Sequence, residues 1–121
     1  MLLLRKARIV GLGSCLPKRV LSNRDLEQMV ETTDEWIFQR TGVSERRIAA
    51  TDETASTMGA KAARTALDRA GIDASQIDLI LVATMTPDYV SPSTACLIQR
   101  EIDAVNAGAI DVQAACTGYL Y

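Results

Sequence analysis

Two apolar runs in the second half of the chain have the pattern of buried strands. Residues 77–83 are apolar almost without interruption after Asp78, and residues 109–112 form a shorter run. Continuous apolar runs are typical of parallel strands covered on both faces, whereas a strand with one face in water alternates apolar and polar residues. Near the start of the chain, residues 8–13 form a third β-favouring run that closes with glycine. This run predicts a first strand that ends in a turn.

Two short helical segments follow the first run. Asn23 or Ser22 is an N-cap candidate for a helix that extends to about residue 30. Thr32 and Glu35 fit a capping box, in which the hydroxyl and the carboxylate each accept a hydrogen bond from a free backbone N–H group. Gly42 then provides a stop, because glycine favours the left-handed conformation in which many helices end.

Two longer helical segments flank the run at 77–83. Residues 54–69 are rich in alanine and are followed by Gly71 at the helix end, and the small side chains predict a closely packed neighbour. After a long loop, Ser93 is the N-cap candidate of a helix whose end falls at Asp103. Aspartate adopts the left-handed conformation less easily than glycine, but it can take this position.

The order strand, three helices, strand, helix, strand predicts an α/β fold with a mostly parallel sheet and covering helices. At 121 residues, with no linker-like or repeated segment, the chain has the length of one domain or of part of one. Functional residues of such folds lie beyond the carboxyl ends of the strands. Cys116 has this position, because it follows the run at 109–112.

Composition and charge exclude several classes of partner. Apolar residues make up 48% of the chain, enough to supply a core, and the net charge is −2 with acidic and basic residues interspersed. No Lys/Arg tract predicts a nucleic-acid or anionic-membrane surface. The first six residues place apolar side chains before the charges, the reverse of a signal peptide, and no run is long enough to span a membrane. We therefore expect a cytoplasmic protein.

The three cysteines, Cys15, Cys96 and Cys116, are the candidate chemical groups. Their odd number and wide spacing argue against a disulfide framework or a metal site, and the chain contains no histidine. A cysteine between a strand and a helix is a candidate nucleophile, because N–H groups and the helix dipole stabilise a thiolate. Free cysteines are more often small buried side chains, and we read Cys15 and Cys96 in that way.

Six blocks in order resemble the family of β-ketoacyl-acyl-carrier-protein synthase III, a condensing enzyme with a thiolase-like fold. The resemblance extends over essentially the whole chain. One block would be weak evidence, whereas six in the same order are specific. The blocks are Asn23–Val30, Thr33–Gly42, Glu45–Ala49, Ile77–Thr84, Pro92–Cys96 and Asp111–Gly118.

The resemblance implies an acyltransferase that begins fatty-acid synthesis. Such an enzyme takes an acyl group from acyl-CoA onto a cysteine and condenses it with malonyl-acyl-carrier protein, with loss of carbon dioxide. The resemblance implies that the nucleophilic cysteine of the family corresponds to Cys116 in this sequence. A cysteine suits thioester exchange, because the acyl group stays activated on sulfur. Coenzyme A is then a substrate, and no permanently bound cofactor or metal is implied.

The resemblance also places the coenzyme A entrance at Thr32, Trp36 and Arg40. A tryptophan face can stack on adenine, and an arginine can meet phosphate or base. The competing interpretation is that Trp36, the only tryptophan, is a core anchor and that Thr32 is only a helix cap. Ser91 matches a position that lines the acyl pocket of the partner subunit in a homodimer, although loop serines are mostly solvated.

The family's catalytic His and Asn have no counterpart in these 121 residues. We therefore expect residues 1–121 to be the N-terminal β/α half of a thiolase-like enzyme, completed by a C-terminal half or a complementary chain. Alone, the chain would leave strand edges and apolar surface uncovered. Two alternatives remain: a related polyketide-starter or hydroxymethylglutaryl-CoA-type synthase, and a truncated chain that binds acyl-CoA without catalysis.

Overall fold

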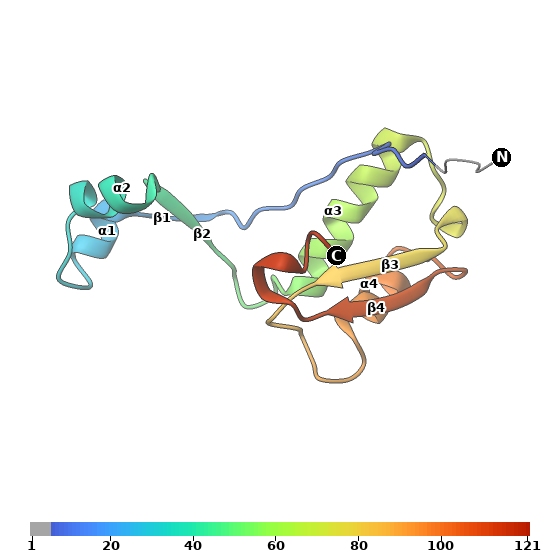
Figure 1. The fold of residues 1–121 in the computed structure, drawn as a ribbon. Helices are drawn as coiled ribbons and strands as arrows, with labels where there is room; N and C mark the ends of the chain where they lie inside the picture. The colour runs from blue at the N-terminus through green and yellow to red at the C-terminus, as the bar shows by residue number, and fades with distance from the viewer. Residues whose placement is uncertain (1–5) are drawn as a thin grey trace. The chain divides into compact units, whose positions relative to one another are not determined.

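The computed structural model describes residues 6–121, and the chain divides into two compact units. The first unit contains the chain up to Cys15 together with residues 54–121, and the second contains residues 16–53. The sequence has no linker-like segment at either junction, so this division was not predicted. Figure 1 labels the helices and strands.

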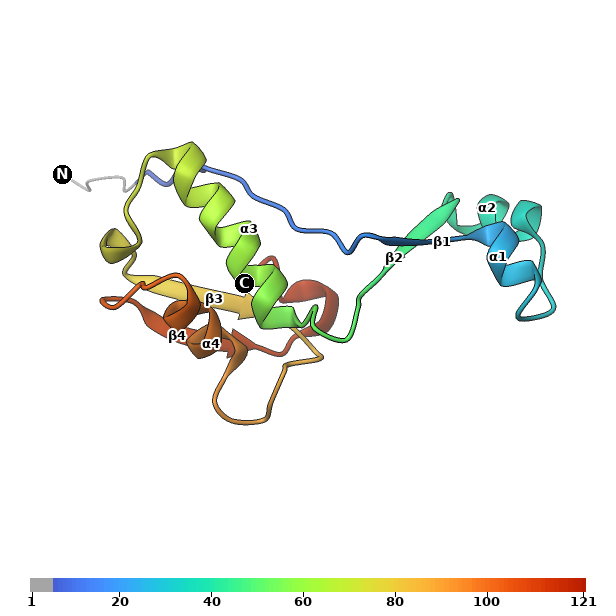
Figure 2. The ribbon, with the colours of Figure 1, turned by 180° about the vertical axis from the view of Figure 1, so that it is seen from behind.

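The first unit is built on a parallel pair of strands covered by two helices. Strand β3 pairs with β4 in parallel, with Leu81 opposite Ile110. Both helices pack on the face that carries Ile80 and Val82, and Figure 2 shows them on the near side of the two strands. The helices and strands of this unit are α3 (Ala55–Ala70), β3 (Leu79–Ala83), α4 (Thr94–Glu101) and β4 (Gly108–Val112).

The helix boundaries in this unit follow the sequence signals closely. Helix α3 begins one residue after the predicted start, with Thr54 as its N-cap, and Gly71 ends it in the left-handed conformation as predicted. Ser93 caps α4 by accepting a hydrogen bond from the N–H of Cys96. Asp103 takes the left-handed conformation just beyond α4, with φ at 58°. Between the helices and the sheet lies the apolar core, whose buried members are Ala60, Ile98, Ile102, Ala104 and Ala107.

The prediction that the strand at 77–83 is covered on both faces is wrong for the described residues. Strand β3 begins at Leu79, and its exposure alternates along the strand. Leu79 and Leu81 are each 51% exposed, and Ile110 on β4 is 53% exposed. The helices of residues 6–121 cover only the opposite face of the pair, so the apolar run does not by itself reveal how many faces are covered.

The predicted strand at residues 8–13 is also wrong. Residues 6–17 contain no strand, because they have no ladder partner within the described chain. Instead, this segment runs close to α3, where a side chain at Gly11 would collide with the carbonyl oxygen of Ala66. Gly13 makes the same close approach to Ala62. The two glycines thus serve backbone packing rather than a turn after a strand.

The second unit contains an antiparallel strand pair and two short helices. Strand β1 (Arg19–Ser22) pairs with β2 (Glu45–Ile48), and neither strand was predicted. Both strands have only four residues, and β2 consists mostly of charged residues, so their pattern is not distinctive. Helix α1 (Asn23–Glu27) ends earlier than the predicted residue 30, and Ser22 rather than Asn23 is its N-cap.

Helix α2 (Asp34–Thr41) ends at Gly42 in the left-handed conformation, as predicted, but its start differs. Thr33 rather than Thr32 is the N-cap, and its hydroxyl accepts a hydrogen bond from the N–H of Trp36 at 3.1 Å. The predicted capping box between Thr32 and Glu35 is therefore wrong, because the N-cap lies one residue later and the residue three positions after it is Trp36. Two consecutive threonines make the position of the cap ambiguous from sequence alone.

Candidate functional site

Cys116 lies on a tight turn just beyond β4. The turn is a 3₁₀ helix, Ala115–Thr117, and it begins with Ala115 at a φ of 45°. The N–H of Thr117 donates to the carbonyl of Ala114 at 3.1 Å, and the Thr117 hydroxyl donates to the same oxygen at 2.7 Å. Cys116 is exposed, whereas Cys15 and Cys96 are half-buried. Cys116 is therefore open to solvent at the end of a strand.

The turn is held close to the ends of both parallel strands. Gly118 is buried, and a Cβ atom there would lie 3.1 Å from the Cβ of Ala83 at the end of β3. The N–H of Ala115 points to the sulfur of Met85 at 3.4 Å. Because the contacts come from the strand ends and the loop after β3, the turn is fixed on more than one side.

From Cys116 to Tyr121 the chain forms this 3₁₀ helix and the turn after it, and no α-helix is assigned within these residues. A further bond, from the N–H of Tyr121 to the carbonyl of Thr117 at 3.2 Å, has the i to i−4 spacing of an α-helix. One such bond does not form the aligned array of peptides that gives a helix its dipole. The described residues therefore do not supply the helix-dipole contribution that the sequence argument assigned to the thiolate.

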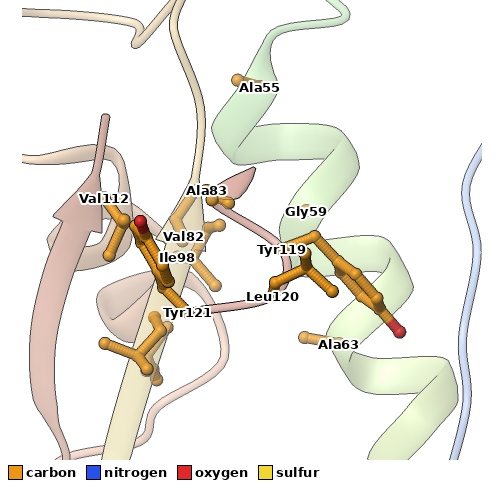
Figure 3. Close-up of a pocket in the computed structure, with 13 residues that line it drawn as sticks. Ala55, Gly59, Ala63, Val82, Ala83, Ile98, Val112, Tyr119, Leu120 and Tyr121 are labelled. Atoms are coloured by element: carbon orange, nitrogen blue, oxygen red, sulfur yellow. The ribbon is translucent and has the colours of Figure 1, made fainter. Parts of the chain in front are cut away.

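The residues after Cys116 form one wall of an apolar pocket of about 630 Å³ (Figure 3). Tyr119, Leu120 and Tyr121 approach Gly59 of α3 and Val82 of β3 in this view. Cys116 itself is not among the lining residues. The pocket therefore lies beside the cysteine turn and not around its sulfur.

Trp36 and Arg40 form a stacked pair on α2. The guanidinium carbon of Arg40 lies 5.4 Å from the centre of the Trp36 ring, within the range of a cation–π interaction. Trp36 is 56% exposed, which contradicts the core-anchor interpretation. An exposed indole beside a guanidinium offers a flat apolar surface and a positive charge to the same ligand.

Thr32 lines a second pocket, of about 250 Å³, together with Trp36, Thr33 and Glu31. Thr32 has no helix-capping role, because Thr33 performs it. The structure thus brings Thr32, Trp36 and Arg40 together within residues 16–53, whereas Cys116 belongs to the other unit.

Ser91 is exposed in the loop between β3 and α4, and it lines none of the described pockets. The same loop is anchored by Asp88, a residue that sequence reasoning missed. One Asp88 oxygen accepts the N–H of Ser56 at 3.0 Å, and the other accepts the Ser56 hydroxyl. The N–H of Asp88 is 3.4 Å from the hydroxyl of Thr94. Asp88 therefore joins the middle of the loop to the start of α3 and of α4.

The pKa of Asp88 reflects this anchoring. Burial raises the pKa of the carboxyl, but hydrogen bonds from the hydroxyls of Ser56 and Thr54 and from the N–H groups of Ser56 and Ala55 lower it. The net result is a pKa below the ordinary value for aspartate. Asp88 therefore stays ionised, and its carboxylate accepts hydrogen bonds at the N-terminus of α3.

Asp111 has the corresponding role at α4. Its two carboxylate oxygens accept the N–H groups of Thr94 at 2.7 Å and of Ala95 at 2.8 Å. The only signal of this contact in the sequence is an aspartate inside an otherwise apolar strand, because a carboxylate there needs hydrogen-bond donors. The bond ties β4, the strand that leads to Cys116, to the start of α4.

Residues 6–121 offer neither a metal site nor a membrane-spanning helix. No group of three or more His, Cys, Asp or Glu side chains there is arranged to hold a metal ion. In the same range, no helix combines the length and the apolar character needed to cross a membrane.

Comparisons with known proteins show which proteins the chain is similar to. No family model matches the chain. The chain is 54% identical to β-ketoacyl-acyl-carrier-protein synthase III of Thioalkalivibrio sulfidiphilus, over 95% of its own length and 36% of the relative's. It is 56% identical to the protein of the same name from Sulfurovum sp., over 92% of its own length and 33% of the relative's. The chain therefore spans about a third of the length of these curated relatives.

Solved structures agree with this assignment. 3-Oxoacyl-acyl-carrier-protein synthase III from Aquifex aeolicus has a TM-score of 0.92 and 48% identity, covering 96% of this chain and 37% of that one. A priming β-ketosynthase from a polyketide biosynthetic pathway has a TM-score of 0.89 and 45% identity, covering 93% of this chain and 34% of that one. Over the part that it spans, the chain is therefore similar to β-ketoacyl-acyl-carrier-protein synthase III proteins and has the thiolase-like α/β fold of the solved structures.

Proposed function

We propose that this chain carries the acyl-accepting cysteine of an enzyme that begins fatty-acid synthesis. The observation that carries the proposal is the position of Cys116, an exposed thiol on a fixed turn at the end of β4, within a sequence 54% identical to a β-ketoacyl-acyl-carrier-protein synthase III. Residues 1–121 are then the N-terminal β/α half of the enzyme.

In the first step, the Cys116 sulfur attacks the carbonyl carbon of an acyl-CoA thioester. A new carbon–sulfur bond forms to Cys116, and the bond to the coenzyme A sulfur breaks. Coenzyme A leaves as a thiolate that takes up a proton. The acyl group remains a thioester, which preserves its reactivity for the next step.

In the second step, malonyl-acyl-carrier protein loses carbon dioxide, and the resulting carbanion attacks the acyl carbon on Cys116. The carbon–sulfur bond to Cys116 breaks, which frees the enzyme and releases a β-ketoacyl product. The 121 residues contain no histidine, so an imidazole that assists this decarboxylation has to come from outside them. The backbone N–H of Cys116 is one candidate donor to the carbonyl oxygen of the acyl-enzyme.

Trp36, Arg40 and Thr32 form the proposed coenzyme A entrance. The indole face is available for adenine, and the Arg40 guanidinium is available for phosphate or base. Ser91, on the exposed loop, is the proposed contribution of one subunit to the acyl pocket of its partner in a homodimer. A cytoplasmic location and the absence of a permanently bound cofactor stay predictions.

Acylation followed by peptide mass spectrometry tests the proposal. We expect native protein incubated with acetyl-CoA, or with a longer acyl-CoA, to gain one acyl group on the peptide that contains Cys116. Cys116→Ser should abolish the adduct, and the matched variant Cys15→Ser should retain it. Acylation at Cys15 or Cys96 in place of Cys116 would contradict the assignment. Binding of acyl-CoA without any adduct would instead support a non-catalytic role.

A polyketide-starter synthase is the second candidate. The structural similarity to the priming β-ketosynthase, with a TM-score of 0.89, favours it as the alternative. Both candidates use the same cysteine chemistry, so the acyl group and the carrier protein discriminate them. Condensation with the carrier protein of fatty-acid synthesis supports the first candidate, and condensation only with a polyketide carrier protein supports the second.

A further inference from the structure

The second unit has a polar residue at its centre instead of an apolar core. Among residues 16–53, only Pro17 and Asn23 are buried, and Asn23 is just 1% exposed. A buried amide is stable only when its donors and acceptor are paired. The partners of Asn23 therefore indicate what this residue holds in place.

The Asn23 side-chain nitrogen contacts both ends of α2. It donates to the carboxylate of Asp34, the first residue of α2, at 2.8 Å. It also donates at 2.7 Å to the carbonyl of Val43, which lies just beyond the left-handed Gly42 that ends α2. These two bonds use both N–H groups of the amide. One side chain thus fixes the beginning and the end of the helix.

The remaining groups of Asn23 join α2 to the strand pair. Its side-chain oxygen accepts a hydrogen bond from Arg46 on β2 at 2.8 Å. Its backbone N–H donates to the carbonyl of Ser44 at 3.0 Å. Arg46 also reaches the carbonyl of Leu21 on β1, so the amide lies at the junction of α1, α2, β1 and β2.

Helix α2 depends on these bonds because it has little apolar packing. It has only eight residues, and none of them is buried. An isolated helix of this length is unstable in water, so its position has to come from tertiary contacts. A second polar contact also holds the start of α2 in place, because the Glu27 carboxylate accepts a hydrogen bond from the N–H of Asp34 at 2.6 Å.

We propose that Asn23 is a positioning residue for the coenzyme A entrance, because it holds the two ends of the helix that carries Trp36 and Arg40. Asn23 itself does not contact the ligand in this assignment. The inference rests on the proposed function, since it assumes that Trp36 and Arg40 meet coenzyme A. A small displacement of groups that orient a substrate has a large effect on binding and turnover.

The test compares coenzyme A binding by native protein and by Asn23→Ala, using calorimetric titration with free coenzyme A. We expect Asn23→Ala to raise the dissociation constant by about 10-fold to 100-fold. The Michaelis constant for acyl-CoA should rise with it, and that for malonyl-acyl-carrier protein should stay unchanged. A merely structural role would lower the fraction of active protein without this selective change.

A matched control lies on the same helix. The Gln39 amide donates to Glu35 at 3.1 Å in an exposed position and joins α2 to no other element. Gln39→Ala also removes one amide from α2, yet it should leave coenzyme A binding within about twofold of native, since changes at exposed positions have small effects.

Trp36→Ala separates failure of this inference from failure of the proposed function. If Trp36→Ala weakens coenzyme A binding at least tenfold and Asn23→Ala does not, the positioning role of Asn23 is overturned. The assignment of Trp36 to the coenzyme A entrance is then still supported. If Trp36→Ala has no effect, the entrance itself is overturned, and the positioning role with it.

Three further variants keep the test decisive if Asn23→Ala does not fold. Asp34→Asn preserves side-chain volume but removes the charge from the bond to Asn23, and it should weaken coenzyme A binding in the same direction. Combining Asn23→Asp with Asp34→Asn restores the amide–carboxylate pair between these two positions in the reversed orientation, but the donor to the Val43 carbonyl stays lost, so we expect partial recovery relative to the single variants. Recovery of coenzyme A affinity in this double variant supports the role. Native affinity in both Asn23→Asp alone and Asp34→Asn alone overturns it.

Discussion

Asp111 offers the sharpest test of how the strand leading to Cys116 is held. Replacing Asp111 with alanine removes the carboxylate that accepts the N–H groups of Thr94 and Ala95. Both of these residues are 0% exposed, so water cannot replace the lost acceptor without opening the structure. The substitution therefore leaves two buried donors unpaired at the start of α4.

The expected cost follows from these two bonds. A hydrogen bond to a charged group contributes about 1.5 to 3 kcal/mol, and the loss is greatest when the remaining partner is buried. A negative charge at a helix N-terminus contributes about 0.3 to 1 kcal/mol more. Allowing for partial relaxation, we expect Asp111→Ala to lower the free energy of unfolding by about 3 to 5 kcal/mol. This is a large part of the roughly 5 to 15 kcal/mol that stabilises a typical domain.

Urea unfolding followed by far-ultraviolet circular dichroism measures the effect. Asp78→Ala is the matched control, because Asp78 is an exposed aspartate just before the partner strand β3. We expect the control to change the free energy of unfolding by less than about 0.5 kcal/mol. The loss of unfolding free energy in Asp111→Asn should lie between those of the other two variants. Asparagine keeps one acceptor oxygen, but its N–H₂ group faces one of the two backbone N–H donors. A loss below about 1 kcal/mol in Asp111→Ala would refute the reasoning, because the two N–H groups would then have other partners.

Three further predictions concern the same unit. The pKa of Asp88 is lower in the folded protein than in the unfolded chain, so its stabilisation is complete above about pH 4 and is lost as the pH falls through the folded-state pKa. Asp88→Asn should therefore flatten the acid side of the stability–pH curve measured by urea unfolding, and an unchanged curve would contradict this assignment. Gly118→Val should lower the free energy of unfolding by about 1 to 3 kcal/mol, because the new side chain has to fit 3.1 Å from the Cβ of Ala83. Ile98→Ala should cost about 2 to 5 kcal/mol in the same assay, since Ile98 is 5% exposed in the core. Val105→Ala, at an exposed position, is its control, and equal losses in both variants would argue against this core assignment.

The sequence by itself determined the elements whose signals are local. The start and end of α3 were predicted at Thr54 and Gly71, and the start of α4 was predicted at Ser93. The left-handed conformation of Asp103 was also anticipated. These features depend on hydrogen bonds and backbone preferences within a few residues, so the neighbouring sequence contains the information. The position of Cys116 just after an apolar strand followed from the same kind of reading, whereas its exposure came from the structure.

The tertiary structure decided the features that depend on distant partners. Residues 8–13 have a strand-like pattern but no strand partner in the described chain, whereas β1 and β2 form because they pair with each other. The choice of Thr33 over Thr32 as the cap of α2 depends on how the chain enters the helix. A buried asparagine such as Asn23 resembles any polar residue in a sequence, and only its partners at Asp34, Val43 and Arg46 reveal its role. The physical reason is that hydrogen bonds between distant segments depend on where the fold brings those segments together, which local patterns do not specify.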